Sequence, residues 1–97
     1  MNMSKNIFDN ALKLAAKYPN TFQLPNTSML SKIKVGDNVK VCLNNERFWC
    51  LVKGVDFDKK TLVASIDNIL QWNDLKLGDT VYLNFYNIYD IKFIYFK

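Results

Sequence analysis

The chain has 97 residues, of which 49% are hydrophobic and 14% aromatic, and its formal net charge is +4 at pH 7. This length suits one domain with a single modest core, and three glycines with two prolines are too few for a disordered chain. The absence of histidine excludes zinc sites of the Cys/His kind, catalytic triads and the usual acid–base group at neutral pH.

An amphipathic helix is predicted over residues 4–18. Ser4 can cap its start, and Pro19 ends it by restricting the preceding residue and removing a donor. At 100° per residue, one continuous arc holds the apolar side chains Ile7, Phe8, Ala11, Leu12, Leu14, Ala15 and Tyr18. We interpret this helix as a cover for one end or face of the sheet that follows. The alternative is a basic helix lying on a membrane or a partner.

Residues 19–33 are predicted to form an extended tether. Phe22 and Leu24 are spaced so that they can contact the core, and Thr27 or Ser28 can cap one short helical turn.

Residues 34–97 are predicted to form a barrel of five short strands. We expect these strands at residues 39–43, 47–55, 61–66, 80–85 and 88–96, with a loop at 67–76. A four-residue turn would join the first two strands and place Leu43 opposite Phe48. The predicted fold class is therefore α+β, with an N-terminal amphipathic helix packed on a small five-stranded antiparallel SH3-like barrel in one domain, 1–97.

The strand over residues 47–55 is apolar on both faces. Cys50 belongs to the face that points into the barrel, whereas Trp49 lies on the other face, where the helix is the natural cover. Cys42 points away from Cys50, and thiols on opposite faces cannot be bridged without moving the backbone. We therefore expect two free thiols and a reducing compartment.

A short motif occurs twice along the chain. Residues 33–39 read IKVGDNV and residues 75–81 read LKLGDTV, at an offset of 42. Glycine supplies a permissive backbone before a strand, and aspartate can accept hydrogen bonds from nearby amides. The two copies mark two equivalent strand starts.

Five motifs follow one another in order: YPNTF at 18–22, GDNVKV at 36–41, ERFWC at 46–50, IDN at 66–68 and LKLGDTV at 75–81. In this order and spacing the chain resembles the YegJ-like family of bacterial domains of unknown function. The resemblance implies a small barrel with an N-terminal extension and no established catalytic activity. The chain departs from the family pattern after Asn68, where Asp-Pro tends to follow and this sequence has Ile69-Leu70-Gln71-Trp72.

We predict no catalytic residue, no metal and no cofactor. Asp56 and Asp58 alternate as metal ligands can, but Lys59 and Lys60 follow and would neutralise a cation site, which favours a polar turn. Cys50 is expected in the core, where thiols are inert. A small hydrolase or isomerase is the weakest of the functions considered.

The candidate partner-binding residues combine tryptophans with an arginine, the types that dominate binding hot spots. They are Arg47, Trp49, Asp67, Asn68 and Trp72. Two alternatives stay open at this point. Asp67 and Asn68 can instead cap their loop through an Asx turn, and Trp49 can instead pack against the core or the helix.

The function expected is non-catalytic binding of a protein partner by a small inhibitor, immunity or adaptor protein. The alternative is a single-stranded nucleic-acid binder that uses the aromatic tail of residues 82–96 and the N-terminal lysines. The charge distribution disfavours a nucleic-acid surface on the strands. Residues 1–34 carry a net charge of +4, whereas residues 35–97 carry eight basic and eight acidic side chains. No apolar run is longer than five residues, whereas a membrane helix needs about 20, so we expect a cytoplasmic protein that does not bind a membrane.

Overall fold

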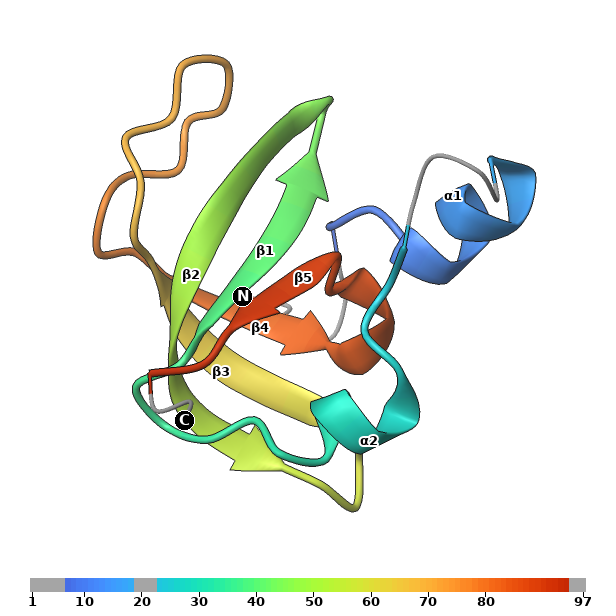
Figure 1. The fold of residues 1–97 in the computed structure, drawn as a ribbon. Helices are drawn as coiled ribbons and strands as arrows, with labels where there is room; N and C mark the ends of the chain where they lie inside the picture. The colour runs from blue at the N-terminus through green and yellow to red at the C-terminus, as the bar shows by residue number, and fades with distance from the viewer. Residues whose placement is uncertain (1–6, 19–22, 95–97) are drawn as a thin grey trace.

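Five strands form one antiparallel sheet in the computed structural model, which describes residues 7–18 and 23–94. The strands are β1 (Asn38–Leu43), β2 (Glu46–Asp56), β3 (Thr61–Ile66), β4 (Thr80–Asn84) and β5 (Asp90–Lys92). The helices are α1 (Ala11–Lys17), α2 (Thr27–Leu30) and the 3₁₀ turn η1 (Phe85–Asn87). Figure 1 shows α1 and α2 beside the strands, with the 3₁₀ turn joining β4 to β5. No helix within the described residues is long and apolar enough to cross a membrane.

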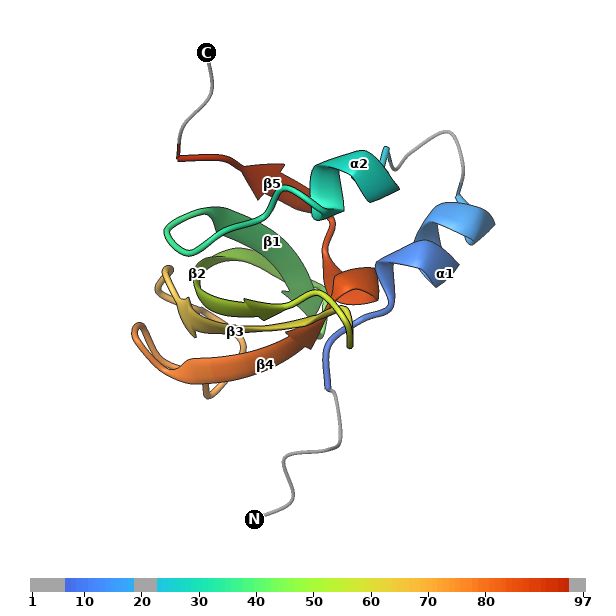
Figure 2. The ribbon, with the colours of Figure 1, turned by 90° about the horizontal axis from the view of Figure 1, so that it is seen from below.

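Among the described residues, the sheet does not close on itself through backbone hydrogen bonds between its first and last strands. Its strand order is β4-β3-β2-β1-β5, so β4 and β5 are the two edges among the described residues. Figure 2 shows β5 and β4 at opposite ends of the row of strands. A five-stranded antiparallel sheet was predicted and is confirmed, whereas a closed barrel stays a prediction.

The hairpin between β1 and β2 turns on only two residues. Asn44 and Asn45 have φ values of 51° and 65°, which is the left-handed pair that a type I′ turn requires. Val41 therefore pairs with Phe48, and the predicted pairing of Leu43 with Phe48 is wrong by two positions. Because side chains alternate with a period of two, this shift leaves each side chain on its predicted face.

The core confirms the predicted separation of the cysteines. Cys50 is fully buried in the main core, while Cys42 is buried in a second cluster with Ala11 and Tyr89. Both thiols are free. The buried residues of the main core are Phe8, Ile33, Val39, Val41, Leu43, Phe48, Cys50, Val52, Leu62, Ala64, Ile66, Val81, Leu83, Ile88 and Ile91.

Helix α1 is shorter than predicted and does not bury one continuous apolar face. It begins at Ala11, after Asn10 accepts a hydrogen bond from the Lys13 amide at 3.1 Å, and the predicted cap at Ser4 lies outside the described residues. Residues 7–10, which precede it, are not helical, so the helical period does not apply to them. Phe8 therefore enters the main core, while Leu12 stays 60% exposed.

The linking segment follows the prediction in part. Asn26 caps α2 by accepting a hydrogen bond from the Met29 amide at 2.9 Å, so the cap stands before the predicted Thr27 or Ser28. Leu24 packs against the second cluster as expected. The predicted contact of Phe22 lies outside the described residues.

The last strand is also shorter than the predicted 88–96. The chain leaves β4 at Asn84, whose amide donates to Asn87 Oδ1 at 2.8 Å and so starts η1. The Asn87 side chain is buried and donates to the carbonyl oxygen of Asp9 at 3.1 Å. This polar link draws the chain toward α1 before β5 begins, and residues 95–97 lie outside the described part.

The repeated motifs form the same aspartate-capped turn twice. Asp37 Oδ2 accepts the amide of Lys34 at 2.9 Å, and Asp79 Oδ2 accepts the amide of Lys76 at 2.8 Å. Each aspartate amide also donates back to the carbonyl of the same lysine, at 3.1 and 2.9 Å.

Both turns dock on the neighbouring strand in the same way. Gly36 and Gly78 have φ values of 100° and 90°, which side chains rarely adopt. Their amides donate to the carbonyls of Val52 in β2 and Ile66 in β3, and the amides of those two residues donate back to the carbonyls of the aspartates. The predicted equivalence of the two strand starts is therefore confirmed bond for bond.

Candidate functional site

The loop of residues 67–79, between β3 and β4, is held on the β1–β2 hairpin by one carboxylate. Glu46 accepts hydrogen bonds from the amide of Gln71 at 2.6 Å, the amide of Trp72 at 3.0 Å and the side-chain amide of Asn73 at 2.9 Å. The Gln71 amide, followed by the other two donors, lowers the pKa of Glu46. The tip of the loop is therefore attached to the first residue of β2.

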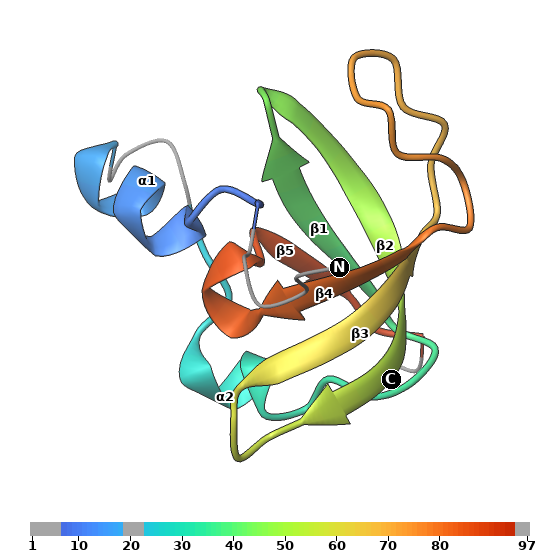
Figure 3. The same ribbon diagram turned by 180° about the vertical axis from the view of Figure 1, so that it is seen from behind.

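A second contact joins the loop to the turn of the hairpin. The side-chain amide of Asn73 donates to the Leu43 carbonyl at 3.0 Å, and its Oδ1 accepts from the Asn44 side chain at 2.8 Å. Leu70 and Leu75 pack against the main core on either side of the tip. Figure 3 shows this loop rising beside the β1–β2 hairpin.

The fixed loop points two large apolar side chains outward. Trp72 is 69% exposed and Ile69 is 83% exposed. Both lie on a segment whose backbone and flanking leucines are already held by protein contacts. Their exposure is therefore a feature of an ordered loop.

Asp67 and Asn68 extend the pairing of β2 with β3. The Asp67 amide donates to the Trp49 carbonyl at 3.0 Å, and Asn68 Oδ1 accepts the Trp49 amide. Asp67 Oδ2 also accepts from the Asn38 side chain at 3.0 Å. These contacts reach across to β2 and to Asn38, whereas an Asx turn would bind backbone groups within the loop, and they fix the base of the loop.

Trp49 and Arg47 lie on the outer face of β2. The ammonium groups of Lys40 and Lys92 lie 5.6 and 5.4 Å from the centroid of the Trp49 ring, within the range of cation–π attraction. The Arg47 guanidinium lies 5.8 Å from the centroid of the Tyr89 ring. Lysines from β1 and β5 thus cover the half-buried Trp49, where we expected the helix.

The structure brings some of the candidate residues together. Trp49, Asp67 and Asn68 are directly hydrogen-bonded, and Trp72 lies farther along the same loop. Glu46 and Asn73 hold that loop and were not identified from the sequence. Their partners lie 25 to 30 residues away along the chain, and no local periodicity marks such contacts.

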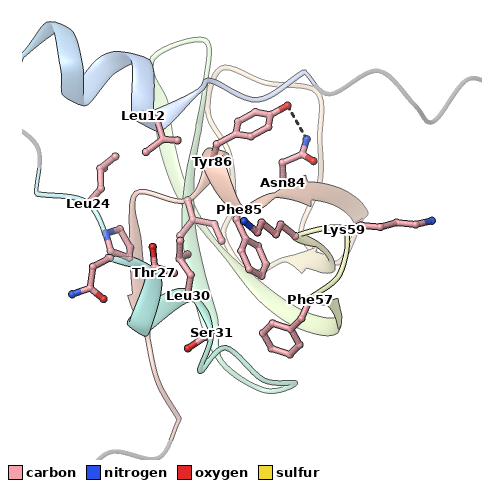
Figure 4. Close-up of a pocket in the computed structure, with 14 residues that line it drawn as sticks. Leu12, Leu24, Thr27, Leu30, Ser31, Phe57, Lys59, Asn84, Phe85 and Tyr86 are labelled. Carbon is pink, nitrogen blue, oxygen red and sulfur yellow. Dashed lines mark hydrogen bonds between the residues drawn. The ribbon is translucent and has the colours of Figure 1, made fainter.

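A separate apolar groove lies between α1, α2, η1 and the β2–β3 turn. It encloses about 730 Å³. Figure 4 shows Leu12 and Leu24 on one side, Phe57 on the other and Phe85 between them. The Phe57 and Phe85 rings meet edge to face, with 6.1 Å between their centroids. Its remaining lining residues are Pro25, Asn26, Thr27, Leu30, Ser31, Lys59, Lys60, Asn84, Tyr86 and Ile88.

The two thiols are protonated at neutral pH. Burial raises the pKa of Cys50 to about 12, and burial followed by the neighbouring Asp9 raises the pKa of Cys42. A protonated thiol is a poor nucleophile. Within residues 7–18 and 23–94, no three His, Cys, Asp or Glu side chains gather closely enough to hold a metal ion.

The loop of residues 67–79 and the outer face of β2 thus form a surface that is held in place by hydrogen bonds and exposes aromatic and apolar side chains. Comparisons of the chain with protein-family models, with curated proteins and with solved structures gave no match.

Proposed function

We propose that the chain is a non-catalytic protein-binding module, of the inhibitor, immunity or adaptor kind, whose contact surface is centred on Trp72 with Ile69 beside it. The observation that carries this proposal is the attachment of the loop to Glu46, which holds a 69% exposed tryptophan on an ordered backbone. Tryptophan is among the residue types most enriched in binding hot spots. Because the loop is ordered before the partner arrives, binding costs less conformational entropy.

The other candidate residues support the same surface. They are Arg47, Trp49, Asp67 and Asn68. Asp67 and Asn68 set the base of the loop, while Arg47 and Trp49 offer a cationic and an aromatic side chain on the adjacent strand. The proposal includes an SH3-like barrel, supported by the curled five-stranded sheet. It also includes membership of the YegJ-like family, supported by the order and spacing of the five motifs.

A second candidate function, single-stranded nucleic-acid binding, has one observation in its favour. Trp49 lies on a sheet face with two lysine ammonium groups within 6 Å of its ring centroid. Bases stack on aromatic side chains, and lysines attract phosphates. Such binding weakens steeply between about 50 and 200 mM salt, which separates it from a contact made by Trp72 and Ile69.

The test is affinity capture from the native host with the wild-type chain, Trp72→Ala and Val35→Ala as three parallel baits. Val35 is a matched control, because it is 62% exposed and belongs to the turn before β1, outside the loop of residues 67–79. We expect one protein that the wild type and Val35→Ala retain and Trp72→Ala loses. The captured protein is then purified and titrated against each bait. Equal retention by all three baits, or retention of nucleic acid that is lost at about 200 mM salt, contradicts the proposal.

A further inference from the structure

The apolar groove between α1, α2, η1 and the β2–β3 turn has walls that are fixed to one another. The Phe85 amide donates to the Lys60 carbonyl at 2.9 Å, which joins η1 to the β2–β3 turn. The buried Asn87 side chain, also in η1, donates to the carbonyl oxygen of Asp9 at 3.1 Å and so holds the residues that lead into α1. These bonds fix three of the four walls, and the groove is therefore a built feature of the fold.

The groove exposes large apolar side chains that the cores do not use. Leu12 is 60% exposed, Phe57 is 49% exposed and Tyr86 is 40% exposed, and all three line this groove. None of the three belongs to the main core or to the second cluster. Apolar side chains gathered in this way mark a binding site, and the volume of about 730 Å³ is typical of small-molecule clefts.

The charged side chains of the groove are all of one sign. Lys59 and Lys60 line it, and no aspartate or glutamate does so among the described residues. Both lysines belong to the turn of residues 57–60, and Figure 4 shows Lys59 across the groove from Leu12 and Leu24. In the part of the chain that the structure describes, neither ammonium group lies within ion-pair distance of a carboxylate. The groove is thus complementary to an apolar molecule that carries a negative charge at one end.

We propose that this groove binds a long-chain carboxylate as a single dissolved molecule, with its chain against the leucines and phenylalanines and its carboxylate near Lys59 and Lys60. Removal of the chain from water supplies binding free energy. The two ammonium groups supply selectivity, because they attract an anionic head group and repel a cationic one.

The groove is distinct from the surface proposed for the protein partner. The turn of residues 57–60 precedes β3, whereas the loop of residues 67–79 follows it, so the two surfaces lie at opposite ends of this strand. Figure 3 shows the loop and α2 at opposite ends of the sheet. A carboxylate in the groove therefore leaves Trp72 accessible, and either proposal can fail without the other.

The probe is dodecanoate below its micelle concentration, titrated into the isotope-labelled full chain while the backbone amide signals are followed by NMR. The control is dodecyltrimethylammonium, which has a chain of the same length and the opposite charge. We expect saturable shifts at Leu12, Leu30 and Tyr86 with a dissociation constant of about 0.1 mM, and no shift at Trp72. The cation should bind at least about tenfold more weakly.

Two double variants of equal net charge separate the groove from general electrostatic attraction. Lys59→Gln with Lys60→Asn removes both groove cations, and asparagine tolerates the φ of 56° at Lys60. Lys53→Gln with Lys76→Gln removes two exposed lysines that do not line the groove. We expect the first pair to weaken dodecanoate binding about fivefold and the second to leave it within about twofold. Leu12→Gln, an exposed position on α1, should weaken it about threefold.

Three results would overturn the proposal. One is equal affinity for dodecanoate and dodecyltrimethylammonium, and another is an equal loss of affinity in the two double variants. The third is sedimentation of the chain with phosphatidylglycerol vesicles without saturable shifts from dodecanoate, which would assign the groove to a lipid surface.

Discussion

The backbone amide of Trp72 donates to Glu46 Oε1 at 3.0 Å, and this bond joins an exposed tryptophan to the first residue of a central strand. The carboxylate also binds the Gln71 amide and the Asn73 side chain, so one acidic group holds three consecutive residues of the loop. The position of Trp72 consequently depends on the ionised state and the length of the Glu46 side chain.

Removal of this carboxylate should release the loop while leaving the sheet folded. In Glu46→Ala the amides of Gln71 and Trp72 lose their acceptors, so we expect their hydrogen exchange to accelerate by about tenfold or more. Glu46→Gln keeps one acceptor oxygen and should show an intermediate rate. Exchange measured by NMR checks this, with the buried amide of Val41 as an internal reference. Unchanged rates at both loop amides would show that Leu70 and Leu75 hold the loop without Glu46.

Acid should release the same loop. The pKa of Glu46 is lowered from its ordinary value of 4.5, mainly by the Gln71 amide. A lowered folded pKa means that the carboxylate stabilises the loop above pH 4.5 and that this contribution disappears as the pH falls through the folded pKa. The amide shifts of Gln71 and Trp72 should therefore titrate together below pH 4.5, with an apparent pKa under that value. A midpoint above 4.5 is inconsistent with the observed hydrogen bonds.

Alkali should destabilise the core through Cys50. Burial raises the pKa of this thiol from 9.0 to about 12, so above pH 9 the unfolded chain releases a proton that the folded chain keeps. Stability from this source is complete below pH 9 and decreases toward pH 12, by up to about 1.4 kcal/mol per pH unit. Urea unfolding between pH 8 and about 10.5 measures this slope.

The matched variant for this measurement is Cys50→Ala. It should be less stable than the wild type by about 1 kcal/mol or more at pH 8, because it leaves a small cavity in the core. Its stability should fall less steeply above pH 9. The remaining slope comes from Cys42 and Tyr89, whose pKa values burial also raises. Parallel curves for variant and wild type would contradict a buried, protonated Cys50.

The two turn aspartates should differ in their contribution to stability. Asp37 is fully buried and binds the Lys34 amide, the Lys34 ammonium group and the Ile94 amide. In Asp37→Asn one acceptor becomes a donor facing another donor, which should cost about 1–3 kcal/mol. Asp79→Asn keeps its turn bond and should cost about 1 kcal/mol or less. Urea unfolding of both variants tests this difference, and equal losses would deny the distinct role of the Ile94 contact.

The hairpin turn offers a stabilising change. Asn45 has a φ of 65°, a conformation that glycine adopts with less strain, and Asn-Gly is the preferred pair for a type I′ turn. Asn45→Gly should stabilise the chain by up to about 1 kcal/mol. Asn44→Gly should gain less, because it also removes the side-chain bond to Asn73. Thermal unfolding ranks the two, and the reverse order would contradict the proposed link between turn and loop.

Strand positions and faces were predictable because they depend on neighbours in the chain. The alternation of Val39, Val41 and Leu43 marks a half-buried strand, and the period of two preserved the faces of Cys42 and Cys50 although the pairing register was wrong. The equivalence of the two turns was likewise predictable from the repeated motif.

The remaining features depend on contacts between distant residues. The start of α1 at Ala11 and the entry of Phe8 into the main core follow from packing against the sheet, which overrides the helical period of residues 7–10. The Glu46 carboxylate meets backbone amides 25 and 26 residues away, and neither amide has a side-chain signature. The exposure of Trp72 is a consequence of that contact and could not be assigned before it was seen.

The central claim is that Trp72, presented by the loop held on Glu46, is the principal contact with a protein partner. Its most direct test is calorimetric titration of the purified partner with the wild type, Trp72→Ala and Val35→Ala. We predict that Trp72→Ala raises the dissociation constant by about thirtyfold or more while Val35→Ala leaves it within about twofold. Equal dissociation constants for Trp72→Ala and the wild type would contradict the account.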